Sequence, residues 1–123
     1  MSKVIFLSTP YSAPTRNQKE LNYHIACIFM ANLLTEGFFV LSPVVQGVPL
    51  SEKYKFPDTW DFWKDYCEKL ISLSDEVFVP DMHGWETSKG VTAEIEIAKR
   101  FNKEVRLITI DKSNQKISYI KNL

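Results

Sequence analysis

Four short apolar runs, separated by stretches with helical periodicity, constrain the fold of this chain more than any other feature. The runs are KVIFLS at residues 3–8, FFVL at 38–41, EVFVP at 76–80 and VRLITI at 105–110. The helical stretches between them are residues 17–36, about 59–73 and 91–101. Strands this uniformly apolar are typical of parallel sheets that are buried on both faces. Residues 116–120 are expected to add a short edge strand.

This alternation predicts an α/β fold for a single domain over residues 1–123. The expected architecture is a three-layer sandwich with a mainly parallel sheet of four to five strands, in a flavodoxin- or Rossmann-like order. Ligands of such open sheets bind beyond the carboxyl ends of the strands. Residues 43–59 contain three prolines and many polar side chains. They are predicted to form a long loop, of the kind that often serves in binding.

Charge and composition exclude several classes of function. The 15 basic residues are matched by 15 acidic ones, so the chain lacks the basic excess of proteins that bind a nucleic-acid backbone or a membrane surface. No apolar run approaches the ~20 residues of a membrane span, and the first apolar run is too short for a signal peptide. Cys27 and Cys67 are 40 residues apart, with no metal-binding spacing. We therefore expect reduced thiols, a cytoplasmic location and no metal site.

The segment SKGVTAEIEIAKRF, residues 88–101, places two glutamates two positions apart on a predicted helix. At about 100° per residue, Glu94 lies within the apolar arc of this helix and Glu96 lies opposite it. We expect Glu94 to point toward the sheet from the first helical turn, where the helix dipole and loop hydrogen bonds favour the ionised form. Such a carboxylate can be a nucleophile or a base, or it can merely satisfy loop amides or an arginine. Periodicity favours neither interpretation.

Ser88 and Gly90 come just before the predicted start of the same helix. A helix N-terminus with free backbone N–H groups can bind an anion such as a phosphate. Both residue types are also ordinary at helix caps, and capping is the simpler interpretation of the pair.

Taken together, these segments resemble the nucleoside 2-deoxyribosyltransferase superfamily, and within it a small bacterial and phage branch related to nucleoside 5'-monophosphate N-glycosidases. The resemblance covers nearly the whole chain. It is carried by FLSTPYS, LLTEGFFVLSPV, WDFWKDYCEKLISLSDEVFV, HGWETSKGVTAEIEIA and NKEV. The most specific part is SKGVTAE, because a similar serine-x-glycine-valine run precedes the catalytic glutamate of the monophosphate-cleaving relatives, which matches Glu94.

The resemblance implies cleavage or transfer of an N-glycosidic bond. Glu94 would attack the anomeric carbon of a ribosyl or deoxyribosyl group, as in retaining glycosidases. Tyr11 matches a tyrosine that contacts the nucleophile and the sugar, although a turn aromatic packed on the sheet edge is an alternative. The residues assigned to the sugar and its 5'-phosphate or 5'-hydroxyl are Ser8, Ser12, Ser88 and Gly90. The resemblance also implies a homodimer or higher assembly, a nucleoside or nucleotide as the small-molecule partner, and no cofactor.

One position departs from the family pattern. Relatives carry an aspartate eight residues before the residue that matches Asp75, and here that position is Cys67. Asp65 points more than a quarter turn away on the predicted helix, so it does not replace the missing group. Asp81, at the end of the third predicted strand, is the next candidate for the general acid, although it can also be a simple turn residue. His83 is a further candidate, with a side chain that ordinarily titrates near neutral pH.

Aromatic residues are the candidates for stacking on a base. Trp85 is assigned to ligand contact, whereas Tyr54, Trp60 and Trp63 are more typical of core residues at helical spacing. Selectivity for the base is expected to lie in residues 46–56.

Two functions from different classes therefore remain. One is a nucleoside or nucleotide N-glycosidase or deoxyribosyltransferase, and the other is a non-catalytic protein that binds or sequesters nucleotides, favoured by Cys67. A phosphoacceptor receiver domain is rejected, because Ser8 and Thr9 stand where acidic residues are needed after the first strand. A GxxxxGK[ST] phosphate loop is also absent from the sequence.

Overall fold

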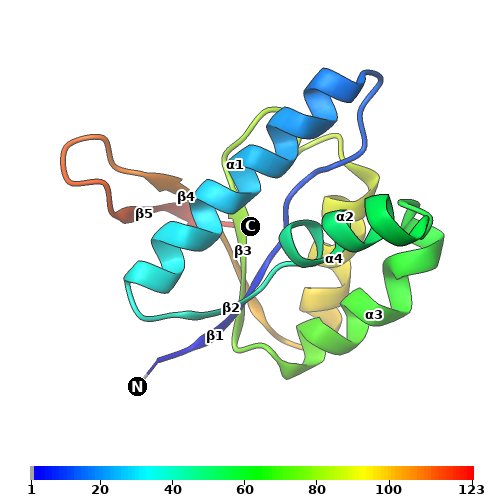
Figure 1. Cartoon of the computed structure of the whole chain (residues 1–123). Coiled ribbons are helices and arrows are strands. Elements are labelled where there is room, and N and C mark those ends of the chain that lie inside the picture. Colours follow the sequence, from blue (N-terminus) through cyan, green and yellow to red (C-terminus); the bar gives the residue numbers. More distant parts are fainter. Residues whose placement is uncertain (1) are drawn as a thin grey trace.

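The computed structural model describes residues 2–123 and has an α/β fold built on one five-stranded sheet (Figure 1). The strands are β1 (Val4–Leu7), β2 (Phe39–Leu41), β3 (Glu76–Pro80), β4 (Glu104–Ile110) and β5 (Ile117–Asn122). Their order is β2-β1-β3-β4-β5; the first four are parallel and β5 is antiparallel to β4. The predicted α/β class, mainly parallel sheet and flavodoxin- or Rossmann-like order are confirmed.

Four helices connect the strands. They are α1 (Arg16–Thr35), α2 (Pro43–Tyr54), α3 (Trp60–Leu73) and α4 (Lys89–Arg100). In Figure 1, α1 crosses one face of the sheet, while α3 and α4 lie side by side on the other. The second helix, α2, packs against α1.

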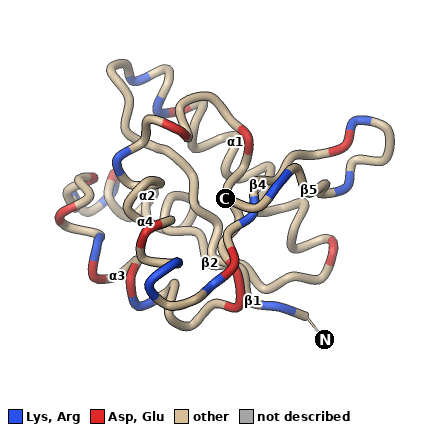
Figure 2. Tube along the Cα trace, turned by 180° about the vertical axis from the view of Figure 1, so that it is seen from behind, with Lys and Arg blue, Asp and Glu red and all other residues tan. Residues whose placement is uncertain are grey.

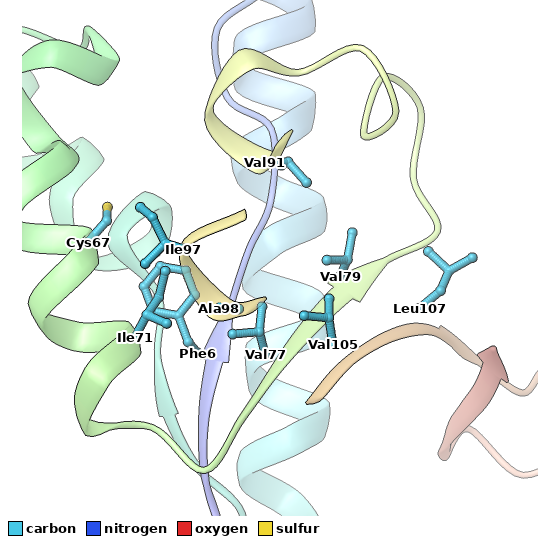
Figure 3. Packing of buried hydrophobic residues seen from close by; sticks show 10 residues of the cluster. All are labelled: Phe6, Cys67, Ile71, Val77, Val79, Val91, Ile97, Ala98, Val105 and Leu107. Atoms are coloured by element: carbon cyan, nitrogen blue, oxygen red, sulfur yellow. The ribbon is translucent and has the colours of Figure 1, made fainter. Parts of the chain in front are cut away.

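Alternation along the strands divides the core into two clusters. Ile5 and Leu7 of β1 face α1 and pack with Phe29 and Leu33 of that helix. Phe6, between them, faces the α3 and α4 side. Figure 3 shows this second cluster, in which Cys67 of α3 and Val91 of α4 lie toward the carboxyl ends of the strands. The two clusters fix both helical layers on the sheet, so the loops at its carboxyl edge are held by rigid elements.

The prediction of a long loop over residues 43–59 is wrong, because most of this segment forms α2. The Ser42 hydroxyl accepts a hydrogen bond from the backbone N–H of Val45 at 3.1 Å, and the Gln46 side chain accepts one from the N–H of Ser42 at 2.9 Å. Pro43 occupies the first turn, where its fixed φ suits a helix and its missing N–H is not needed. The sequence thus contained a helix start signal, and the proline content concealed it.

Charged residues of both signs are interspersed along the chain, as Figure 2 shows. Within residues 2–123, no helix combines the length and the apolar character needed to cross a membrane.

A buried carboxylate ties the amino edge of the sheet together. Glu76, which is 5% exposed, forms an ion pair with Arg106 at 2.7 Å and a second with Lys3. We expect Glu76→Ala to lower the free energy of unfolding by about 2–3 kcal/mol, because the arginine loses its buried partner. Chemical denaturation measures this change. Glu104→Ala removes the exposed partner of the same arginine and serves as the control, with an expected loss below about 1 kcal/mol. Equal losses of stability in the two variants would contradict the view that the burial of Glu76 makes its ion pair with Arg106 more important.

Candidate functional site

A cavity of about 500 Å³ lies at the carboxyl edge of the sheet. Its walls come from residues 9–12 after β1, residues 43–51 of α2, residues 58–67 around the start of α3, and residues 87–94 at the start of α4. This is the edge at which open α/β sheets bind ligands, and the volume is within the usual range for small-molecule sites. Two indole side chains, Trp60 and Trp63, line one part of it, and a single carboxylate from α4, Glu94, is buried in it.

Glu94 is 6% exposed and its carboxylate is held in place by the first side chain after β1. The Ser8 hydroxyl, just beyond β1, donates a hydrogen bond of 2.6 Å to Oε1 of Glu94. Burial raises the pKa of Glu94 to about 7, while Ser8 and the nearby Cys67 thiol act in the opposite direction. A carboxyl group with a pKa near neutrality in a cavity is typical of functional sites.

Part of the prediction for these glutamates is confirmed and part is wrong. Glu94 is buried and Glu96 is exposed, as the helical periodicity indicated. However, α4 begins at Lys89, since the Ser88 hydroxyl caps it by accepting the N–H of Val91 at 3.2 Å. Glu94 therefore lies in the second turn, beyond the free N–H groups of the first. Its burial outweighs the groups that favour ionisation, which explains a pKa above the usual range for a glutamate.

Cys67 lies on α3 against the same carboxylate and is 1% exposed. Burial, and then the negative charge of Glu94, raise the pKa of the Cys67 thiol far above its ordinary value. The side chain therefore stays a neutral thiol at physiological pH. Where the resemblance to nucleoside 2-deoxyribosyltransferases implies an acidic group, this site has a weak hydrogen-bond donor.

The loop after β1 supplies the floor of the cavity. Thr9, Tyr11 and Ser12 all line it. The loop is anchored to α1, because the Asn22 side-chain amide donates to the Tyr11 carbonyl at 3.1 Å. Burial, and then the charge of Glu52, raise the pKa of the half-buried Tyr11 phenol. The hydroxyl that bonds to Glu94 belongs to Ser8, whereas the resemblance assigned contact with the nucleophile to Tyr11.

Ser88 and Gly90 line the cavity at the start of α4. The Ser88 oxygen is used as the helix cap, so the capping interpretation is correct for this residue. A Cβ at Gly90 would come within 3.9 Å of Trp60, which is an ordinary contact distance. A methyl group would therefore fit at this position without moving Trp60.

Three predicted site residues lie apart from the cavity, on the loop between β3 and α4. Asp81 and His83 are exposed, and neither they nor Trp85 belong to the cavity wall. The Trp85 indole N–H donates to Asp81 at 3.3 Å, and its ring packs against the core cluster under α4. The backbone N–H of Asp81 bonds to the Ile108 carbonyl of β4, which holds the start of this loop beside β4. Asp81, His83 and Trp85 therefore do not contribute to the cavity wall.

The sequence interpretation missed several residues of the cavity wall. Trp60 and Trp63, which were interpreted as more typical of core residues, do pack against the core cluster, but both also line the cavity. Gly47 of α2 is buried against Trp63, and a Cβ there would lie 3.2 Å from the indole. Had the helix start at Ser42-Pro43 been recognised, the sequence would have predicted the helix α2 that forms this part of the cavity wall. Over residues 2–123, no group of three or more histidine, cysteine or acidic side chains is placed to hold a metal.

The bond from Ser8 gives a direct prediction for the acidity of Glu94. Ser8→Ala removes a donor that favours the ionised carboxylate, so the pKa of Glu94 should rise above about 7 by roughly 1 pH unit. Titration of the carboxyl stretching band by infrared spectroscopy, with Glu94→Gln to assign the band, measures the shift. Ser8→Thr keeps the hydroxyl and should restore the original titration. An unchanged pKa in Ser8→Ala would show that the bond does not tune the carboxylate.

Comparison with known proteins adds a family without a described activity. No curated protein matches the chain. A family model described as Domain of unknown function (DUF1937) matches residues 3–110. The matched region runs from the start of β1 to the end of β4 and so contains every wall of the cavity, from Thr9 to Glu94. Because the match spans most of the chain, this protein belongs to the DUF1937 family.

Proposed function

We propose that this protein cleaves or transfers the N-glycosidic bond of a nucleoside or its 5'-monophosphate, with Glu94 as the nucleophile. The observation that carries the proposal is a buried carboxylate, oriented by Ser8, in a cavity of about 500 Å³ that also has two indole rings in its wall. An indole offers a flat apolar surface for a nucleobase, and the carboxylate offers an oxygen for the anomeric carbon. The resemblance of SKGVTAE to the catalytic segment of N-glycosidases supports the same chemistry.

The reaction would proceed in two steps. A Glu94 oxygen forms a bond to the anomeric carbon while the carbon–nitrogen bond breaks, and the electron pair of that bond leaves with the base. The base nitrogen then takes a proton from water or a neighbouring acid. In the second step water attacks the anomeric carbon, loses a proton and releases the carboxylate. If a second base attacks instead of water, the outcome is transfer.

The leaving base gets little help from Cys67, the side chain that stands where the resemblance implies an aspartate. The Cys67 thiol has a pKa far too high to act as an efficient acid at neutral pH. General acid catalysis typically contributes about 100- to 10,000-fold in rate. The rate is therefore expected to depend on how well the departing base is stabilised by its own protonation. The lack of an efficient acid at Cys67 also favours the second candidate function, a protein that binds nucleotides without turning them over.

The resemblance also leads us to propose where the protein acts and how it assembles. We place the protein in the cytoplasm of a bacterium or in phage-infected cells, as a homodimer or higher assembly whose partner is a small nucleoside or nucleotide. Light scattering on the purified protein would test the self-association.

The decisive experiment is incubation of the purified protein with a panel of ribo- and deoxyribonucleosides and their 5'-monophosphates. Free base is measured by chromatography over a range of enzyme concentrations. Release of base in proportion to enzyme concentration supports the glycosidase. Tight binding with no release over many hours would favour the binding protein, and neither binding nor release would reject both.

A further inference from the structure

The loop between β1 and α1 is fastened to the helix by a single hydrogen bond. Residues 9–14 form no helix or strand, and Pro10 and Pro14 have no backbone N–H to donate. Within residues 2–123, the only hydrogen bond that this segment makes is the one of 3.1 Å from the Asn22 amide to the Tyr11 carbonyl. One side chain of α1 therefore supplies the directional contact that fixes the loop.

The amide of Asn22 is oriented for this contact by its neighbours. Asn22 is 3% exposed, and a buried amide has to satisfy its polar atoms within the protein. Its Oδ1 accepts a hydrogen bond from the Gln18 side chain at 2.9 Å, which leaves its Nδ2 to donate to Tyr11. The backbone N–H of Gln18 donates to the Thr15 hydroxyl at 3.1 Å, so the chain of contacts begins at the cap of α1.

The same loop contributes to the cavity. Tyr11 and Ser12 line it, whereas Asn22 is not among the lining residues. A ligand binds more tightly to a wall that is already ordered, because it does not have to immobilise the loop on binding. Asn22 can therefore affect a ligand only through the residues that it fixes.

We propose that Asn22 is a positioning residue, which holds Tyr11 and Ser12 in the conformation that binds the substrate. The inference rests on the proposed function for the identity of the substrate, but the immobilisation of the loop can be measured without a ligand. Loss of the Asn22 contact should weaken substrate binding and leave the contact between Ser8 and Glu94 intact.

The first variant is Asn22→Asp, which keeps the size of the side chain and the bond from Gln18 but presents an oxygen to the Tyr11 carbonyl. Asn32→Asp is the matched control, since Asn32 lies on the same helix, donates to the Ile28 carbonyl at 2.9 Å and does not line the cavity. Chymotrypsin applied to the native protein measures the loop, because it cleaves after Tyr11 only when the loop opens. We expect this cleavage to be about 3- to 10-fold faster in Asn22→Asp and unchanged in Asn32→Asp.

Cleavage after Tyr54, at the exposed end of α2, is the internal reference. Release of the loop raises the cleavage rate after Tyr11 alone. An equal rise at both positions would mean that Asn22→Asp weakens the whole protein, and it would overturn the inference.

A second pair of variants covers the case in which an aspartate at this buried position prevents folding. Gln18 is only partly buried, so its replacement disturbs the fold less. Gln18→Glu offers only acceptors at neutral pH, so the Asn22 amide should turn its N–H toward residue 18 and its oxygen toward Tyr11. Gln18→Lys keeps a donor toward Asn22. We expect faster cleavage after Tyr11 in Gln18→Glu and the parent rate in Gln18→Lys, and equal rates in the two variants would overturn the inference.

Calorimetry on the Glu94→Gln protein measures binding without turnover, with adenosine and adenosine 5'-monophosphate as probes. Adding Asn22→Asp or Gln18→Glu should raise the Kd by about 3- to 10-fold, and adding Asn32→Asp should not change it. With Glu94 intact, Gln18→Glu should leave its infrared titration unchanged, because the bond from the Ser8 N–H to the Phe78 carbonyl holds Ser8 independently of the loop. A shifted titration would place the disturbance at Glu94 itself and overturn the proposed role.

These measurements separate the inference from the proposed function. If the parent protein releases base and the Asn22 and Gln18 variants bind the probes as tightly as the parent, the inference fails and the proposed function stands. If the parent protein neither binds a probe nor releases base from any nucleoside, the proposed function fails. Cleavage after Tyr11 that still depends on Asn22 would then leave the inference standing, and cleavage that does not would overturn both.

Discussion

Glu94→Gln is expected to reduce the release of base from a nucleoside by on the order of 10,000- to 1,000,000-fold, as loss of a nucleophile does in other covalent mechanisms. The amide fills the same space and still accepts the hydrogen bond from Ser8, so the cavity keeps its shape. It has no charged oxygen with which to attack the anomeric carbon. Substrate affinity should therefore change little while turnover collapses. Chromatography of the base and calorimetry of binding measure the two effects separately.

Glu96→Gln is the matched control, because it makes the same chemical change two residues along the same helix at an exposed position. Its activity should stay within about twofold of the parent protein. Mass spectrometry of the parent protein during turnover should reveal a glycosyl adduct on the peptide that contains Glu94. Substantial activity in Glu94→Gln, or an adduct on another residue, would mean that the nucleophile has been misassigned.

The same substitution should stabilise the folded protein at alkaline pH. The pKa of Glu94 is raised from an ordinary value of 4.5 to about 7 by its burial, so between these values the folded state binds more protons than the unfolded state. The free energy of unfolding therefore falls as the pH rises through this window, and the full penalty, about 3 kcal/mol, is present above about pH 7. Glutamine does not titrate and escapes the penalty.

We thus expect Glu94→Gln and the parent protein to have similar stability near pH 4, and the variant to be more stable by about 3 kcal/mol near pH 8. In thermal unfolding this corresponds to roughly 10 °C. Melting curves from pH 4 to 8, with Glu96→Gln beside them, measure the difference and its pH dependence. If the gap between variant and parent stayed constant or narrowed with rising pH, Glu94 would have an ordinary acidity in the folded protein.

The elements that follow a simple hydrophobic period were predictable from the sequence. The buried strands at Val4–Leu7 and Glu76–Pro80, and the inward side of α4 at Glu94, were found because burial and periodicity coincide there. The helix α2 was missed because prolines are normally evidence against a helix, although Pro43 stands at the one turn that tolerates it well.

The contacts within the site were less predictable, because they join residues far apart in the chain. The bond between Ser8 and Glu94 spans 86 positions, and no local pattern announces it. The loop with Asp81 and His83 starts at the correct edge of the sheet, but neither of these two side chains lines the cavity, which the loop meets at Thr87 and Ser88. The end of a strand determines where the following loop begins, but it does not determine where the side chains of that loop lie.

The close approach of Gly47 to Trp63 has a consequence for how this cavity can change. Since a methyl group on that glycine would lie 3.2 Å from the indole, the helix and the ring approach each other more closely here than a side chain at position 47 would allow. A larger residue at position 47 would have to push the ring aside, and the ring is tethered by its N–H to the Pro57 carbonyl at 2.8 Å. The room available to a flat ligand is therefore set by the absence of one side chain, and related sequences could retune it by a single exchange at that spot.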